Sequence, residues 1–139
     1  LPRAVRNAIP EHHGSMVMAF FFHKALETDP TARRADYSYP GPRPRSKETA
    51  ILMLADGVEG ASRALAEPTP SRIRGLVQRI IEERVRDGQL DEANITISEL
   101  ARIRESFIPV LTAIFHVRAP YPAAPKQQPK REYDARRDA

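Results

Sequence analysis

Three side chains in this sequence have the chemistry of metal ligands, and they come from two separate segments. His12 and His13 are adjacent in the segment 10–14, which ends at a glycine, and Asp56 falls within an apolar helical pattern. Imidazole nitrogens and carboxylate oxygens are ligands for zinc, iron and manganese. The chain has no cysteine, which excludes thiolate ligands and disulfides. These residues indicate part of a metal-dependent site.

Each of these side chains also has a structural interpretation. A carboxylate beside an apolar stripe must be paired, hydrogen-bonded or metal-bound, because burying it bare costs several kcal/mol. Asp56 would need no metal if it lay at the solvent edge of its helix and paired with Arg63. Glu59, one turn beyond Asp56, either faces the same cleft or pairs with Arg63 at i,i+4. The histidine pair would likewise be a solvated dipeptide if it binds no metal. If an imidazole does bind metal, its second nitrogen needs a hydrogen-bond partner, and Glu11 is a candidate.

A basic cluster precedes the helical pattern that holds Asp56. Arg43, Arg45 and Lys47 lie within five residues of one another. Such cations hold phosphate through charge-assisted hydrogen bonds, so they are candidate substrate-binding residues. The alternative is a solvated loop, which is the commoner role for such residues. No glycine-rich phosphate loop and no nucleophile elbow is present.

The composition limits the classes of function. A chain of 139 residues fits one domain, and its 41% hydrophobic and 29% charged residues are ordinary for a soluble globular protein. The net charge of +4 is mild, and does not indicate a nucleic-acid-binding protein. No apolar run reaches the roughly 20 residues that cross a bilayer. The chain starts at Leu1 without a methionine, and its first residues are typical of an internal segment of a helical protein, so we expect an excised piece.

The elements that must position these residues are helices. Apolar residues recur at helical spacing, which predicts an all-α bundle of about five helices. The predicted helices cover residues 2–9, 15–28, 47–66 and 70–87, with a fifth from the capping box at 96–99 to about 115. Residues 29–45 contain four prolines and predict a loop. Pro109 is expected to kink the fifth helix or start a second one.

Two glycines beside the candidate carboxylate lower the helix propensity of its segment. Gly57 and Gly60 follow Asp56 within one turn. A glycine in a helix allows a ligand or another part of the chain to approach closely. We therefore expect a close approach at this end of the helix.

Four segments together resemble the C-terminal half of the cytoplasmic HD domain of the seven-transmembrane-receptor HD hydrolases, the PgpH-type enzymes. These segments are residues 9–14, 39–42, 46–56 and 87–92. The resemblance runs from residue 1 to about 122, and several long motifs in the same order make it specific. The remaining residues, 123–139, are expected to form a disordered charged tail.

The resemblance implies a partial HD-domain phosphohydrolase-like fold and a cyclic di-AMP phosphodiesterase that yields linear pApA. It implies two divalent metal ions, iron or manganese, held by an H…HD…H…HH…D ligand set. In this chain His12 and His13 match the HH pair and Asp56 matches the closing D. The first three ligand groups are absent and are expected before Leu1. The 139 residues alone are therefore expected to bind little or no metal and to be inactive.

The resemblance also implies a parent protein anchored in the bacterial inner membrane, with this part on the cytoplasmic side and soluble by itself. Its partner would be a cyclic dinucleotide rather than nucleic acid. A domain without its leading helices leaves an apolar face exposed, and we expect self-association around Phe20, Phe21 and Phe22. Two other functions stay open, namely a non-catalytic helical binding or sensory module and a degenerate HD domain with a structural role.

Overall fold

The computed structural model describes residues 1–116, and these residues form helices and loops. The elements are α1 (Arg3–Glu11), α2 (Ala19–Thr28), the 3₁₀ helix η1 (Arg34–Tyr37), α3 (Lys47–Ser62), α4 (Pro70–Arg86) and α5 (Ile97–His116). The all-α prediction is confirmed. The predicted tail lies outside the described residues. No helix among residues 1–116 is long and apolar enough to span a bilayer.

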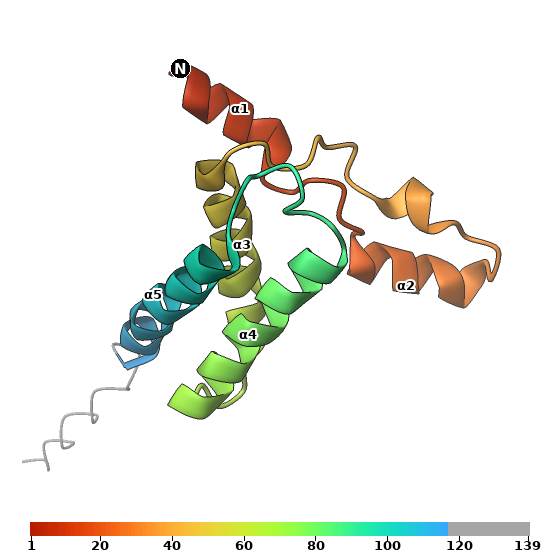
Figure 1. The fold of residues 1–139 in the computed structure, drawn as a ribbon. Helices are drawn as coiled ribbons and strands as arrows, with labels where there is room; N and C mark the ends of the chain where they lie inside the picture. The colour runs from red at the N-terminus through yellow and green to blue at the C-terminus, as the bar shows by residue number, and fades with distance from the viewer. Residues whose placement is uncertain (117–139) are drawn as a thin grey trace, which may run out of the picture.

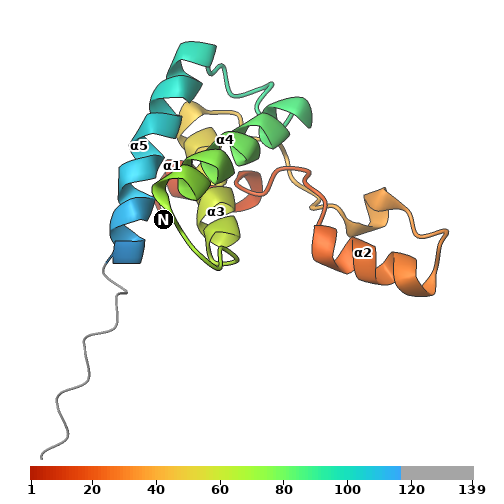
Figure 2. The same ribbon diagram turned by 90° about the horizontal axis from the view of Figure 1, so that it is seen from below.

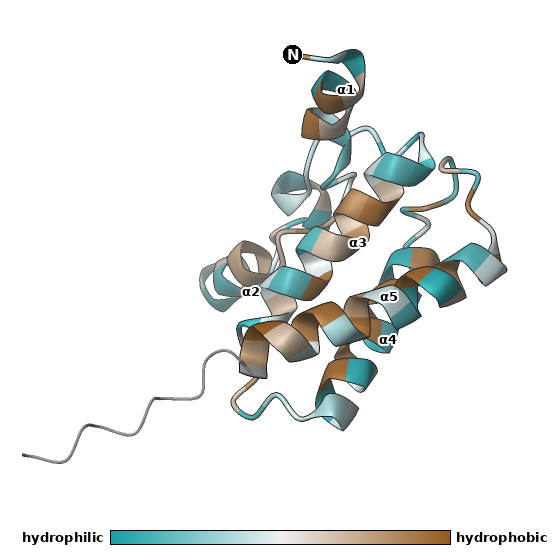
Figure 3. Ribbon diagram, turned by 90° about the vertical axis from the view of Figure 1, so that its left-hand side faces the viewer, coloured by the Kyte–Doolittle hydropathy of each residue, from teal (hydrophilic) through white to brown (hydrophobic). Residues whose placement is uncertain are grey.

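The core lies where α3, α4 and α5 pack against one another (Figure 1). Met53 and Leu54 of α3 and Ile73 and Val77 of α4 are fully buried, and Leu111 of α5 is nearly so. Hydrophobic residues recur along all three helices (Figure 3), as an amphipathic pattern requires. Helix α1 crosses one end of this bundle and contacts α3. This arrangement brings the end of α1 to the helix that carries Asp56.

Helix α3 begins as predicted but ends earlier. The Ser46 hydroxyl caps it by accepting a hydrogen bond of 3.2 Å from the backbone N–H of Thr49. At the other end, the backbone N–H of Ala64 and of Leu65 bonds a carbonyl three residues back. This tightening ends the helix at Ser62 instead of residue 66, because i→i+3 bonds replace the α-helical ladder.

Helix α2 begins at Ala19, although the sequence predicts a start at residue 15. Gly14 has a φ of +54° and turns the chain, after which residues 16–18 run extended beside residues 37–39. Met18 donates its N–H to Tyr37 O at 2.8 Å, and Tyr39 donates to Met16 O at 2.9 Å. These bonds take up the backbone groups that a longer helix would use.

Helix α2 and η1 form an arm beside the bundle (Figure 2). Within residues 1–116, η1 is the one helical element that α2 contacts, and α2 has no buried residue. Phe20 and Phe21 are 72% and 58% exposed, whereas Phe22 packs against Tyr37 at 5.8 Å between ring centroids. Exposure is therefore confirmed for two of the three phenylalanines. Self-association stays a prediction.

Helix α5 has the predicted start but a different middle. The Glu99 carboxylate accepts the Thr96 N–H at 2.8 Å, and the Thr96 hydroxyl accepts the Glu99 N–H at 3.1 Å. This is the predicted capping box. Helix α5 continues through Pro109 to His116 as one element, so the alternative of a second helix starting at Pro109 is wrong, and a kink at Pro109 stays a prediction.

Candidate metal centre

The structure brings the histidine pair and Asp56 together. The pair follows the last residue of α1, and Asp56 lies on α3, the helix that α1 contacts. His13 Nδ1 lies 3.8 Å from Asp56 Oδ2, and the rings of His12 and His13 are 4.0 Å apart between centroids. Residues 43 positions apart in the sequence thus meet at one place on the surface.

The His12 ring has an orientation suited to metal binding. Its Nδ1 lies 2.9 Å from Ile9 O and 3.0 Å from Ala8 O. Because carbonyl oxygens only accept hydrogen bonds, Nδ1 carries the proton and the lone pair of the neutral ring is on Nε2. A backbone carbonyl that fixes the tautomer in this way is a common partner of a metal-binding histidine.

Glu11 does not serve as the predicted partner of the histidines. Its side chain is buried and accepts a hydrogen bond of 3.2 Å from the backbone N–H of Arg45. Glu11 therefore joins the end of α1 to the loop before α3, and its effect on the histidine pair is to hold the backbone in place. The prediction failed because backbone carbonyls of the preceding turn were already within reach of His12.

The His13 ring lies against the rings of His12 and Tyr39. It stacks on Tyr39 at 4.3 Å with an interplanar angle of 20°. Burial and the neighbouring His12 lower the pKa of His13 below 6.5, against the opposing attraction of Asp56. A lowered pKa keeps the ring neutral at neutral pH, and the neutral ring is the form that binds metal.

Asp56 is half exposed, with 51% of its side chain accessible, which agrees with the solvent-edge alternative and not with a buried carboxylate. It lies at the edge of the apolar stripe instead of inside it. Arg63, the alternative partner, pairs with Glu59 at 2.7 Å, as the i,i+4 spacing indicated. Within residues 1–116, His13 is the one cationic side chain or imidazole within 4 Å of Asp56.

Two glycines and one glutamine hold the histidine turn, and the sequence prediction assigned none of them to the site. A Cβ on Gly41 would lie 2.1 Å from Gly14 O, so the two loops touch through their backbones. A Cβ on Gly14 would lie 2.4 Å from the Gln89 side chain. Gln89 is buried and accepts the N–H of Ser15 at 3.0 Å. The sequence signal that could have identified Gln89 is its position directly after Gly88, the glycine that follows the end of α4.

The predicted close approach occurs at Gly57. A Cβ there would lie 3.3 Å from the guanidinium of Arg84, which reaches across from α4. Within residues 1–116, nothing lies within 4 Å of the corresponding position at Gly60, so the close approach is at Gly57 and not at Gly60. Burial lowers the pKa of Arg84, while the charges of Glu83, Asp87 and Asp56 oppose the shift.

The three predicted phosphate-binding cations each face a carboxylate. Arg43 lies 3.8 Å from Asp91, Arg45 lies 3.5 Å from Glu92, and Lys47 lies 2.6 Å from Glu99, all measured between charged atoms. The two arginine pairs connect the loop before α3 to the segment between α4 and α5, and the Lys47–Glu99 pair connects the first turns of α3 and α5. A role of Arg43, Arg45 and Lys47 in binding substrate stays a prediction.

The Lys47–Glu99 pair makes stability sensitive to acid. Hydrogen bonds from Lys47 and Thr96 lower the pKa of Glu99 from 4.5 to about 2. The bonded form is the carboxylate, so its contribution is complete above 4.5 and is lost as the pH falls towards 2. We expect Glu99→Gln to be less stable at neutral pH and to lose less stability in acid. Urea unfolding at a series of pH values measures this.

Glu48 supplies the control for that experiment. It is exposed on the first turn of α3, close to Lys47 in sequence. Glu48→Gln removes the same charge, so its acid limb should run parallel to that of the original chain. An acid limb for Glu99→Gln that is also parallel would contradict the assigned pKa shift.

The described residues fit part of a metal site. Two imidazoles and one carboxylate have suitable donor atoms. The tautomer of His12 leaves Nε2 free to bind metal, and the lowered pKa of His13 favours its neutral, metal-binding form. Within residues 1–116, however, no group of three or more histidine or acidic side chains has an arrangement that could hold a metal ion. A metal bound by His12, His13 or Asp56 therefore needs further ligands beyond these residues.

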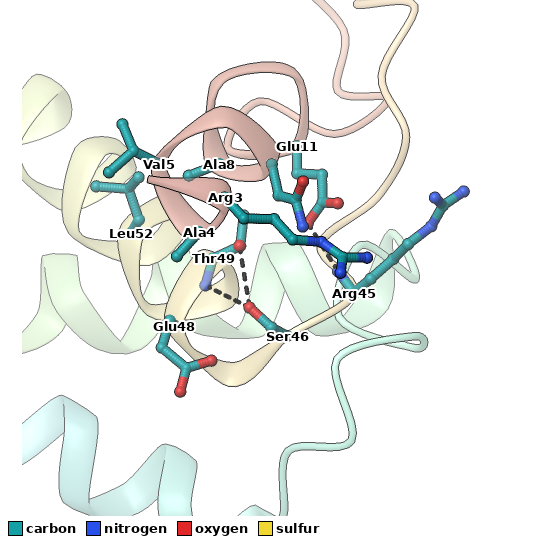
Figure 4. Close-up of a pocket in the computed structure, with 11 residues that line it drawn as sticks. Arg3, Ala4, Val5, Ala8, Glu11, Arg45, Ser46, Glu48, Thr49 and Leu52 are labelled. Atoms are coloured by element: carbon teal, nitrogen blue, oxygen red, sulfur yellow. Dashed lines mark hydrogen bonds between the residues drawn. The ribbon is translucent and has the colours of Figure 1, made fainter. Parts of the chain in front are cut away.

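A groove of about 810 Å³ lies elsewhere, between α1 and the beginning of α3 (Figure 4). Ala4, Val5, Ala8 and Leu52 form its apolar part, and Glu11 and Arg45 meet at one end. The groove is not lined by His12, His13 or Asp56. It is therefore separate from the candidate metal centre.

Comparison with known proteins identifies homologues of this chain. No protein-family model matches the chain. The chain is 41% identical over 122 residues to the cyclic-di-AMP phosphodiesterase PgpH of Listeria monocytogenes, and 40% identical over 126 residues to PgpH of Bacillus subtilis. The crystal structure of the L. monocytogenes PgpH HD domain in complex with cyclic-di-AMP superposes with a TM-score of 0.78 at 40% identity. The chain is a homologue of the PgpH HD domain.

The homology covers most of this chain but a smaller share of its relatives. The alignments cover 88% and 91% of the chain, and 17% and 18% of the two PgpH proteins. The superposition covers 82% of the chain and 53% of the solved HD domain. A second crystal structure of the same domain gives a TM-score of 0.76 at 39% identity. The predicted HD-domain fold is confirmed, for about half of that domain.

Proposed function

We propose that this chain is part of a metal-dependent HD phosphohydrolase that hydrolyses a cyclic dinucleotide, cyclic di-AMP, to linear pApA. The meeting of His12, His13 and Asp56 in a chain homologous to the PgpH HD domain carries this proposal. One solved relative is in complex with cyclic-di-AMP, which supports the choice of substrate. The membrane anchor and cytoplasmic position of the parent belong to the same proposal, and cell fractionation checks them.

The residues of this chain have distinct roles in the proposed site. His12 and His13 would offer ring nitrogens to one metal ion, and Asp56 would offer its carboxylate as the closing ligand of the set. Divalent ions, when bound, supply an activated water and positive charge for the phosphate. Tyr39 holds the His13 ring by stacking, and the Gly14–Gly41 contact holds the turn that carries both histidines.

Metal removal tests this function in the full protein that contains the chain. We expect the protein loaded with Mn²⁺ or Fe²⁺ to convert cyclic di-AMP to pApA, and a chelator to abolish turnover until metal is restored. Chromatography of the nucleotides measures both steps. Binding of cyclic di-AMP without turnover at any metal supply would support the alternative, a non-catalytic binding or sensory module.

A further inference from the structure

A hollow of about 400 Å³ adjoins the candidate metal centre and lies between the end of α4 and the segment 16–19. Tyr39 lines the hollow and stacks on His13. Arg84 also lines it and packs against Gly57, the residue after Asp56. The hollow is not lined by His12, His13 or Asp56, but two of its lining residues contact His13 or the residue after Asp56. Its volume is within the range of small-molecule sites.

Arg84 has a charge that the described part of the chain leaves unbonded. Its Nε is buried and has no hydrogen-bond partner among residues 1–116. Most buried polar groups are bonded, and a desolvated charge without a bond is costly. Packing alone would be served better by an apolar side chain of similar length. The guanidinium therefore fits an anionic ligand.

The acids around Arg84 are directed to other groups. Glu83 lies 3.8 Å from Arg79, and Asp87 lies 3.4 Å from Arg34. Asp56 faces His13. No acid within residues 1–116 comes within 4 Å of the Arg84 guanidinium. The charges of all three carboxylates nevertheless act to raise the pKa of Arg84, against the effect of burial.

We propose that Arg84 is a substrate-binding residue that holds the phosphate of the cyclic dinucleotide that is not cleaved. This proposal rests on the proposed function. The phosphate to be cleaved belongs at His12, His13 and Asp56, and Arg84 lies against Gly57, the residue after Asp56, and lines the hollow. The planar guanidinium fork matches two phosphate oxygens, which an ammonium does not.

The wall of the hollow suits the nucleoside next to that phosphate. Met16, Val17 and Tyr39 supply apolar and aromatic surface. The charged lining residues are three arginines and two acids, and the acids Glu83 and Asp87 pair with Arg79 and Arg34, which leaves Arg84 and Arg86 as the positive charge. Bases stack on aromatic side chains, and phosphates pair with arginine. The hollow therefore combines the two kinds of contact that one nucleotide unit needs.

Substrates with one and two phosphates test this role in the full, metal-loaded protein. We expect Arg84→Met to raise the KM for cyclic di-AMP about tenfold, which is the loss of one charge-assisted bond, with kcat within about twofold. Bis(p-nitrophenyl) phosphate has a single phosphate, so its KM should not change. The KM of Arg84→Lys for cyclic di-AMP should lie between those of the original protein and Arg84→Met. Arg72→Met, an exposed arginine of α4 paired with Glu67, is the control and should match the original protein.

Two further readouts separate binding from folding. Calorimetric affinity of the metal-free protein for cyclic di-AMP should weaken by the same factor in Arg84→Met. The melting temperature should stay or rise, because an unbonded charge has been removed. Equal losses on both substrates would show that Arg84 acts through Asp56, and a lower melting temperature with unchanged KM would show a structural role. Either result overturns the proposal.

The outcome also distinguishes this proposal from the proposed function. If the original protein hydrolyses cyclic di-AMP and Arg84→Met keeps the same KM, the role of Arg84 is wrong and the function stands. If the original protein cleaves bis(p-nitrophenyl) phosphate but neither binds nor hydrolyses cyclic di-AMP, the proposed function fails. The role of Arg84 then fails with it.

Discussion

Asp56→Asn should reduce hydrolysis of cyclic di-AMP by the full, metal-loaded protein about a thousandfold. The amide keeps the shape of the side chain but removes the negative charge that holds a metal ion. A bound metal contributes several kcal/mol to phosphate cleavage, and each 1.36 kcal/mol of barrier is a factor of ten in rate. Turnover assays with pApA detection measure the loss. Elemental analysis should show less bound metal than in the original protein.

The fold should survive this substitution. Asp56 is half exposed and lies outside the buried core, so Asp56→Asn should change the melting temperature of the metal-free protein little. Glu59→Gln is the matched control, because Glu59 lies one turn further along α3 and pairs with Arg63. Its activity should stay within about twofold, as expected for a surface ion pair. Full metal content and more than a tenth of the activity in Asp56→Asn would show that Asp56 is not a ligand.

The helices and their caps could be predicted from the sequence because their signals are local. The predicted helix starts at residues 47 and 70 and the capping box at 96–99 each depend on contacts within one turn, and the structure confirms all three. The meeting of the histidine pair with Asp56 could not be derived from spacing. It depends on how α1 crosses α3. The ligand chemistry of the three residues indicated a metal site, and the family resemblance assigned them to one ligand set.

The groups that support the site were harder to predict because their partners are distant in sequence. Gln89 bonds Ser15 across 74 positions, and Arg84 packs against Gly57 on another helix. Helix α2 starts late because residues 16–18 pair with residues 37–39, a bridge that no helical periodicity contains. Helical spacing also did not predict which apolar residues of α3 are exposed. Ile51 fits the helical spacing, yet it is 39% exposed.

Gly41→Ala should destabilise the 139-residue chain by about 3 kcal/mol. The new Cβ would lie 2.1 Å from Gly14 O, and a backbone atom cannot move aside as a flexible side chain does. Gly41 also has a φ of +26°, which is unfavourable for a residue with a side chain. The strain would fall on the turn that carries His12 and His13. Urea unfolding measures the stability, and histidine NMR chemical shifts report on the turn.

Gly60→Ala makes the same chemical change with the opposite expected sign. Gly60 lies within α3, and no atom of residues 1–116 lies within 4 Å of its Cβ position. Alanine there should stabilise the chain by about 0.5–1 kcal/mol, because glycine loses more backbone entropy in a helix. The two variants together separate loss of glycine flexibility from steric contact. If Gly41→Ala were as stable as Gly60→Ala, the Gly14–Gly41 contact would not hold the histidine turn, and the support proposed for His12 and His13 would have to come from Gln89 and Tyr39 instead.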